Sequence, residues 1–218
     1  MRTIAFVTQK GGSGKSTIAS SLAVAAHEMN ERVCVIDMDP QGSLANWAKT
    51  RGANDIEVVA SGAARLPALL ASLTDKGFTL AILDTPGAEG AASAAAMQVA
   101  ELNIIPSRPS MFDLWASART CAALRDIGGD FVFLLNQCPP AHETARVRDG
   151  VETLEEMGGL ISPLILSRVD YQEAARHGWG VTELDPYGAA AEEMRGLWQS
   201  IKRRLARVTV QQCAPKAA

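Results

Sequence analysis

The hydrophobic positions along the chain fall into short continuous runs rather than into alternating patterns. Four of these runs are IAFVT, VCVID, LAILD and FVFLL, and a longer stretch with helical character follows each of them. Continuous apolar runs are typical of strands that are buried on both faces of a parallel sheet. Strands that alternate with helices indicate right-handed βαβ units. The pattern therefore predicts an α/β fold with a doubly wound, mostly parallel sheet and helices on both faces.

The expected elements cover nearly the whole chain. The expected strands are Thr3–Thr8, Val33–Asp37, Ile56–Ala60, Leu80–Asp84, Leu102–Pro106, Phe131–Gln137 and a short one at Leu164–Leu166. The expected helices are Ser16–Met29, Ser43–Thr50, Leu66–Leu73, Ala91–Ala100, Asp113–Ile127, Glu143–Met157, Tyr171–His177 and Tyr187–Arg207. Residues 208–218 show no periodicity. We expect one domain over residues 1–207 and a disordered C-terminal tail over residues 208–218.

Composition narrows the class of protein. The chain has 218 residues, of which 47% are hydrophobic, enough for one domain with a sizeable core. No apolar run reaches the roughly 18 residues that a membrane-spanning helix needs, and the N-terminus has no signal-peptide pattern. The four cysteines are far apart and form no C-x-x-C pair, so nothing supports a zinc or iron–sulfur site. We expect a cytoplasmic protein.

The strongest chemical signal is a glycine-rich segment between the first expected strand and the first expected helix. It reads Lys10-Gly11-Gly12-Ser13-Gly14-Lys15-Ser16-Thr17, and together with Gln9 it fits the phosphate-binding pattern G-x-x-x-x-G-K-[ST] except at Gln9 itself. The glycines allow successive N–H groups to face phosphate oxygens, and the helix N-terminus adds its dipole. Lys15 is expected to contact the β- and γ-phosphates, and the Ser16 hydroxyl to coordinate Mg²⁺. The segment predicts a site for ATP with Mg²⁺.

Two further segments place acidic residues where expected strands end. VIDMDPQG puts Asp37 and Asp39 at the end of one strand, and LAILDTPG puts Asp84 at the end of another, with Gly87 close behind. Ligands bind at this end of the strands in such sheets. Asp39 could hold Mg²⁺ or position an attacking water, although an Asp-Pro pair can also simply form a turn. Asp84 follows the Walker B pattern and is expected near the metal, and the Gly87 N–H could sense the γ-phosphate.

Together, the K-G-G-x-G-K-S loop, the D-M-D-P-Q-G segment and the L-D-T-P-G segment resemble the ParA/MinD family of deviant Walker ATPases. The likeness covers nearly the whole chain, because residues 107–115, 173–178 and 183–186 also resemble family segments. It is greatest to the small ParA proteins of plasmid and chromosome partition. One departure is Ser13, where the family more often has valine.

The resemblance implies roles for individual residues. Lys10 would be the signature lysine that reaches the nucleotide of a dimer partner, and Lys15 the in-chain phosphate lysine. Asp39 would orient the hydrolytic water. Asn136 falls where family members contact adenine, although a turn-forming asparagine is a nearly equal interpretation. The resemblance also implies slow ATP hydrolysis, an ATP-dependent sandwich homodimer that binds DNA without sequence preference, a ParB-like stimulating protein and a nucleoid location.

Two other functions share parts of this sequence pattern. A MinD-like positioning ATPase would end in a membrane-targeting helix, but the final residues TVQQCAPKAA are too polar to insert, so no membrane is expected. A metabolic enzyme of the dethiobiotin synthetase type would have no use for Lys10 or for the D-x-D-P-Q segment. We therefore expect a ParA-type ATPase of DNA partition or cargo positioning.

The charges are unevenly distributed along the chain. All 24 acidic residues lie at or before Glu193, so residues 1–193 carry a net charge of −9 and residues 194–218 a net charge of +6. An acidic body with a basic end indicates a polyanionic partner. On a helical wheel the basic residues lie off the apolar stripe formed by Met194, Leu197, Trp198, Ile201, Leu205 and Val208. The candidates for DNA-backbone contact are Arg168, Arg195, Lys202, Arg203, Arg204 and Arg207; the alternative is a solvated helix end.

Overall fold

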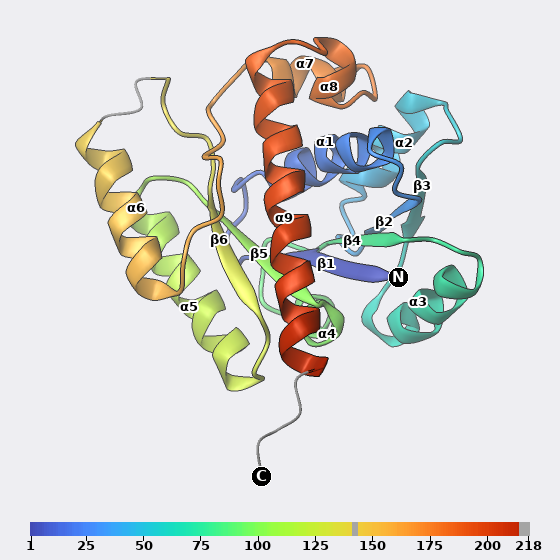
Figure 1. Cartoon of the computed structure of the whole chain (residues 1–218), viewed down its shortest axis with the longest axis horizontal. Helices are drawn as coiled ribbons and strands as arrows, with labels where there is room; N and C mark the ends of the chain where they lie inside the picture. The colour runs from blue at the N-terminus through green and yellow to red at the C-terminus, as the bar shows by residue number, and fades with distance from the viewer. Residues whose placement is uncertain (141–143, 214–218) are drawn as a thin grey trace.

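A parallel sheet forms the centre of the computed structural model, which describes residues 1–140 and 144–213, with side chains described as far as Arg207. Within these residues the sheet has six strands in the order β3-β2-β4-β1-β5-β6, every neighbouring pair of which is parallel (Figure 1). The strands are β1 (Arg2–Phe6), β2 (Val33–Asp37), β3 (Glu57–Ala60), β4 (Leu80–Asp84), β5 (Leu102–Ser107) and β6 (Phe131–Leu135). The predicted fold class is confirmed.

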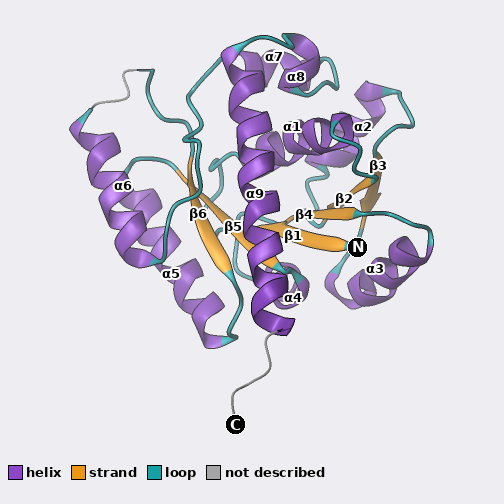
Figure 2. Ribbon diagram, in the orientation of Figure 1, coloured by secondary structure: helices purple, strands orange, loops and turns teal. Residues whose placement is uncertain are grey.

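Helices cover both faces of this sheet (Figure 2). One hydrophobic core includes residues of α1 (Lys15–Glu28), α2 (Ser43–Arg51), α7 (Asp170–Arg176), α8 (Val181–Leu184) and α9 (Ala189–Cys213). The other includes residues of α3 (Leu66–Asp75), α4 (Ala91–Val99), α5 (Met111–Asp126) and α6 (Ala145–Met157), and a short 3-10 turn, η1 (Ala63–Arg65), precedes α3. No helix within the described part of the chain is long and apolar enough to span a lipid bilayer.

Successive strand residues point into opposite cores, which explains the continuous apolar runs. In β1, Ile4 and Phe6 belong to the core beneath α1 and α9, whereas Ala5 belongs to the core on the other face. All three side chains are fully buried. Because both faces are covered, the strand requires an apolar residue at each of these positions.

The last helix packs along the face of the sheet that α1 also covers. In Figure 1, α9 crosses in front of the strands. The predicted apolar stripe is confirmed as far as side chains are described, because Met194, Leu197, Trp198, Ile201 and Leu205 are at most 3% exposed. The helix ends at Cys213 rather than at Arg207, so it takes in the first part of the segment expected as a tail. Residues 214–218 lie outside the described part of the chain.

The expected strand Leu164–Leu166 does not form. Residues 160–166 make only isolated bridges to the region of β6, at Phe133–Leu160 and Cys138–Leu166, and no continuous ladder. Backbone bonds resume at Ile165, which donates its N–H to Leu135 O at 3.0 Å. Pro163 interrupts the pairing because proline has no N–H to donate. Helix α8 was not predicted either, since four residues are too few to show a helical period.

We expect Trp198→Ala to lower the free energy of unfolding by about 3–5 kcal/mol, because it leaves a large cavity beneath α9. Trp198 is 2% exposed in the core between α9 and the sheet. Trp115→Ala is the matched control, because that side chain is 60% exposed, and it should change stability by less than about 0.5 kcal/mol. Denaturant unfolding without nucleotide measures both, and equal midpoints for the two variants would contradict the assignment of this core.

Candidate active site

The parallel register brings the three sequence motifs to one edge of the sheet. β4 lies between β1 and β2, and Asp84 pairs with Phe6 on one side and with Asp37 on the other. A cavity of about 780 Å³ opens at this edge. Residues from all three motifs line it: Gly11, Gly12, Gly14, Lys15, Ser16, Thr17, Asp39, Pro40, Gln41, Ser43, Pro86, Gly87 and Ala88. The structure therefore unites most of the predicted phosphate and metal residues in a single cavity.

The glycine-rich loop has the backbone conformation that phosphate binding requires. Gly12 and Gly14 lie in the left-handed region, with φ of +76° and +90°, and Gly14 O accepts the N–H of Ile18 to begin α1. Two side chains after β6 stabilise the loop by donating hydrogen bonds to its carbonyl oxygens. Asn136 Nδ2 donates to Ser13 O at 2.7 Å, and Gln137 Nε2 donates to Gly12 O at 3.1 Å. A side chain at Gly14 would be strained by its φ of +90°, and its Cβ, 2.4 Å from Asn136 Nδ2, would displace the amide that supports the loop.

Lys15 and Asp84 lie buried beside the cavity. Burial lowers the pKa of Lys15, while the negative charges of Asp84 and Asp39 act in the opposite direction. Burial raises the pKa of Asp84 to about 7, partly offset by the hydrogen bond from Ser16 and by the charge of Lys15. Ser16 Oγ donates to Asp84 Oδ2 at 2.6 Å. Both side chains have therefore lost water that would solvate their charges. A bound polyphosphate with a divalent cation would give them charged partners in place of that water.

The oxygen atoms of this cluster fit a Mg²⁺ ion. Asp84 Oδ1 is buried and has no hydrogen-bond partner among the described residues, which is unusual for a carboxylate oxygen. Ser16 Oγ and the Asp39 carboxylate are further hard oxygen donors beside the same cavity. Hard oxygen donors of this kind suit Mg²⁺, which keeps several waters and is commonly shared with substrate phosphates. Within the described residues, no group of three or more His, Cys, Asp or Glu side chains is placed to hold a metal ion.

The two acids after β2 have different tasks. Asp37 is buried, and its Oδ2 accepts the N–H groups of Leu44 and Ala45 at 3.0 Å, so this carboxylate caps α2. Asp39 lines the cavity, and its Oδ1 accepts the N–H of Gln41 at 2.9 Å. The Asp39-Pro40 pair therefore forms a turn, and the Asp39 carboxylate also lies at the cavity, where its part in binding Mg²⁺ or water stays a prediction. The cap by Asp37 was not predicted.

Gly87 brings the loop after β4 against the glycine-rich loop. A Cβ at position 87 would lie 2.9 Å from both the Cα and the N atom of Gly11, which real side chains do not tolerate. Gly87 lines the cavity, where the sequence analysis expected its N–H to sense the γ-phosphate.

Lys10 occupies a different position from the rest of the motif. It lines a separate hollow of about 300 Å³ rather than the phosphate cavity. Its Nζ lies 3.8 Å from Asp113 Oδ2 and 5.7 Å from the centre of the Phe112 ring. Asp113 also accepts hydrogen bonds from Arg108 and from Ser110 Oγ, at 2.9 and 2.6 Å. No local pattern in the sequence indicates this pairing, because it joins the glycine-rich loop to α5.

Asn136 borders a smaller hollow of about 150 Å³ beside the phosphate cavity, together with Thr17, Tyr171 and Gln172. Its side chain is 3% exposed, and both of its polar atoms are engaged, since Oδ1 accepts the N–H of Gln137. Asn136 is thus a support of the loop at the wall of this hollow. Gln137, which has the same support role, was missed, because a single polar residue after a strand carries no distinguishing pattern.

Three basic residues of α9, and Arg168 before α7, have acidic neighbours that the sequence did not reveal. Arg195 pairs with Glu28, Lys202 with Glu31 and Arg204 with Asp130, and Arg168 pairs with Glu193. Acids distant in sequence fold against these four basic residues, and the charge distribution along the chain does not indicate these pairings. Among the described residues, Arg203 and Arg207 have no acidic partner. Together with Arg204 they line a hollow of about 210 Å³.

The lysines and arginines near the end of α9 lie far from the phosphate cavity. Glu31 and Asp130 come just before β2 and β6, at the amino ends of the strands. The phosphate-binding motifs follow the carboxyl ends. Lys202 and Arg204 therefore occupy the edge of the sheet opposite the candidate active site.

A family model of the CobQ/CobB/MinD/ParA nucleotide-binding domain matches residues 4–181 of the chain. This protein therefore belongs to that family, and it is a P-loop ATPase of the ParA/MinD type. Maintenance of carboxysome distribution protein A from Gloeobacter kilaueensis is 36% identical over 160 residues, covering 72% of each chain. The chromosome-partitioning ATPase Soj from Thermus thermophilus is 26% identical over 156 residues, covering 58% of this chain and 63% of Soj.

Solved structures of the same type share the fold. Apo McdA from Cyanothece has a TM-score of 0.77 at 18% identity, covering 92% of this chain and 99% of that one. The septum site-determining protein MinD from Pyrococcus horikoshii, in complex with Mg-ADP, has a TM-score of 0.73 at 18% identity, covering 95% and 98%.

We expect Lys15→Ala to weaken ATP binding roughly 10- to 100-fold, since a charge-assisted contact to phosphate is worth about 1.5–3 kcal/mol. Lys76→Ala is the matched control, because Lys76 is exposed at the end of α3, and its affinity should stay that of the parent. Isothermal titration calorimetry with ATP and Mg²⁺ measures both. Unchanged affinity in Lys15→Ala would refute the assignment of the phosphate loop.

Proposed function

We propose that this protein is an ATP-switched positioning ATPase, which dimerises face to face around bound ATP and uses hydrolysis to release a cargo or a surface. Lys10 is the observation that carries this proposal. It belongs to the phosphate motif by sequence, yet its side chain lies outside the phosphate cavity and 33% exposed. A cation placed there is suited to the nucleotide of a second copy rather than to its own.

The resting contacts of Lys10 are weak enough to be exchanged. A partly exposed ion pair at 3.8 Å contributes about 0–1 kcal/mol. When Lys10 leaves, buried Asp113 keeps its hydrogen bonds from Arg108 and Ser110, so no charge is left without a partner. A buried carboxylate that lost its only cation would be far more costly. Movement of Lys10 toward a partner is therefore inexpensive.

The surface beside Lys10 also supports association. Met111, Phe112 and Trp115 on α5 are 57%, 70% and 60% exposed, although each is large and apolar. Phe112 packs edge-to-face on Trp115 and also lies near Lys10 Nζ. Exposed apolar clusters of this kind mark interaction sites. Because the cluster adjoins Lys10, we assign it to the same dimer face.

In this proposal, ATP and Mg²⁺ bind in the 780 Å³ cavity and the adenine occupies the hollow beside Asn136. Ser16 and Asp84 would hold Mg²⁺, which would supply positive charge to neutralise the phosphates. Asp39 accepts a hydrogen bond from the attacking water and directs it at the γ-phosphorus. Relatives named for carboxysome distribution and for chromosome partitioning support a positioning task. A ParB-like adaptor protein would stimulate hydrolysis on either kind of cargo.

We further propose that the dimer binds DNA backbone through α9. Arg203 and Arg207, the two cations of this helix without an acidic partner in the described residues, supply the free positive charge, and Arg204 lies beside them. Arg195, Lys202 and Arg168 contribute less, because body acids already pair with them. Contacts to phosphate carry no sequence information. Location at the nucleoid would follow from such binding.

We expect Lys10→Ala to bind ATP with nearly the parent affinity, because Lys10 lies outside the phosphate cavity, but to remain monomeric and to lose turnover. Analytical ultracentrifugation with ATP measures the dimer, and phosphate release measures turnover. Lys49→Ala, on an exposed position of α2, is the control and should dimerise normally. A Lys10→Ala protein that dimerises and hydrolyses like the parent would leave Lys10 as a solvated charge.

We expect the double variant Arg203→Gln/Arg207→Gln to retain ATP-dependent dimerisation and to lose affinity for non-specific duplex DNA. Each lost phosphate contact should lower the slope of log affinity against log salt by roughly 0.9, and a dimer loses four. The control Arg65→Gln/Lys76→Gln removes two exposed cations from the opposite layer. Fluorescence anisotropy over a salt series distinguishes them. Equal slopes in the two variants would place the DNA surface elsewhere.

A further inference from the structure

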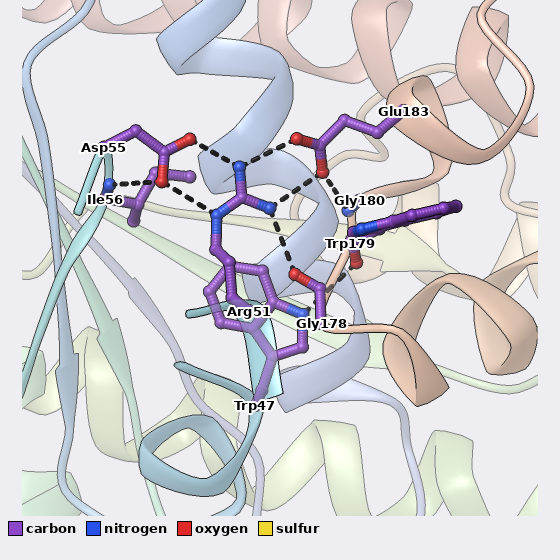
Figure 3. Close-up of polar contacts among 8 residues, drawn as sticks. All are labelled: Trp47, Arg51, Asp55, Ile56, Gly178, Trp179, Gly180 and Glu183. Carbon is purple, nitrogen blue, oxygen red and sulfur yellow. Dashed lines mark hydrogen bonds and ion pairs between the residues drawn. The ribbon is translucent and has the colours of Figure 1, made fainter. Parts of the chain in front are cut away.

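Arg51 ends α2 in a partly buried network that the proposed reaction does not use. Its side chain is only 5% exposed, which is rare for arginine. The guanidinium lies between two carboxylates, Asp55 on one side and Glu183 on the other (Figure 3). Nε and Nη2 donate to Asp55 at 2.9 and 2.5 Å, and Nη1 and Nη2 donate to Glu183 at 2.8 and 2.7 Å. Both pairs are bidentate, the strongest geometry for this kind of bond.

The network joins two segments that are distant in sequence. Arg51 and Asp55 belong to α2 and the turn after it, whereas Glu183 belongs to α8. Arg51 Nη1 also donates to Gly178 O at 3.0 Å, and Trp47 Nε1 donates to Trp179 O at 3.2 Å (Figure 3). The backbones of the two segments lie against each other, since a Cβ on Gly178 would lie 2.3 Å from Arg51 N. α2 is thus fastened to the connection between α7 and α8.

The position of α2 depends strongly on this fastening. The helix has nine residues, and only Leu44 and Trp47 among them are buried. Its N-terminus is fixed by the cap from Asp37, and its C-terminus by Arg51. A short helix with two buried side chains has little packing energy of its own. The network at Arg51 is therefore a strong restraint on the orientation of α2, in addition to its two buried side chains.

The loop that carries Asp39 is continuous with this helix. Asp39 O accepts the N–H of Gly42, the residue before α2, and Asp39 Oδ1 accepts the N–H of Gln41. A rotation of α2 would therefore move the Asp39 carboxylate relative to the cavity. The anchor at the other end is itself part of the nucleotide site, because α7 supplies Tyr171 and Gln172 to the hollow beside Asn136. Arg51 thus fixes the position of the Asp39 loop relative to α7, which forms part of the wall of the nucleotide site.

We propose that Arg51, clamped between Asp55 and Glu183, is a positioning residue for ATP hydrolysis that sets the placement of the Asp39 carboxylate through α2. The inference rests on the proposed role of Asp39 in orienting the attacking water. Arg51 contacts neither the phosphate cavity nor the hollow beside Asn136. Its loss should therefore change the rate of the chemical step and leave ATP binding largely intact.

The test compares Arg51→Gln, Asp39→Asn and the double variant with the parent chain, using ATP with Mg²⁺. We expect Arg51→Gln to bind ATP within about twofold of the parent and to lower the single-turnover hydrolysis rate roughly tenfold or more. The double variant should be no slower than Asp39→Asn alone, because both changes act through one carboxylate. Arg51→Lys should recover part of the rate, because it keeps the charge but cannot bind two carboxylates bidentately.

A general loss of stability is tested by Leu154→Ala. Leu154 is fully buried in α6, on the opposite layer, and the variant should be destabilised while its hydrolysis rate stays that of the parent. Glu183→Gln replaces Arg51→Gln if the latter does not fold. The positioning role is overturned if Arg51→Gln hydrolyses ATP at the parent rate. It is also overturned if the rate losses of Arg51→Gln and Asp39→Asn multiply in the double variant. Normal hydrolysis by Asp39→Asn overturns the water-orienting role and this inference with it.

Discussion

The pairing of β4 between β1 and β2 is the constraint on which the rest of the site depends. In this register Phe6, Asp84 and Asp37 lie at one level of the sheet, so the chain leaves all three strands at the same edge. The glycine-rich loop, the Asp39 loop and the Gly87 loop must then converge. A shift of β4 by one residue would also turn the alternating side chains of that strand into the wrong cores. The hydrophobic pattern therefore fixes the distance between the phosphate loop and its acids.

Burial gives this edge its chemical character. Lys15 and Asp84 are both buried beside an open cavity. Burial lowers the pKa of Lys15 and raises the pKa of Asp84, and both shifts favour the neutral form of the side chain. Groups in that condition interact more strongly with a charged ligand than exposed ones do, because less water remains to screen them. Lys15 begins α1, and Ser16 next to it connects that helix to Asp84 through a hydrogen bond. The outer residues Lys10 and Asp39 remain closer to solvent, where loops can reposition them.

Local patterns in the sequence were sufficient for the sheet, most helices and the phosphate motif. They succeeded where a property belongs to one segment, such as a double-sided apolar run or glycines before a helix. They failed where a property depends on distant segments. The acids that neutralise Lys202 and Arg204 lie more than 70 residues away along the chain, and the hold of Gln137 on Gly12 spans a similar distance. Pro163 does indicate an interruption of strand pairing, but the apolar residues around it favour the prediction of a strand.

The contact between Gly11 and Gly87 has an unequal consequence for the two glycines. A methyl group built on Gly11 would meet open space, and the φ of Gly11 is not among the positive values of the loop, whereas a methyl group on Gly87 would strike the backbone of Gly11. The close approach of the two loops thus depends on the missing side chain of Gly87 and not on that of Gly11. Sequence drift at position 11 meets no steric barrier within this fold, but at position 87 any Cβ would push the two loops apart. A single hydrogen atom in place of a side chain keeps the cavity closed at that corner.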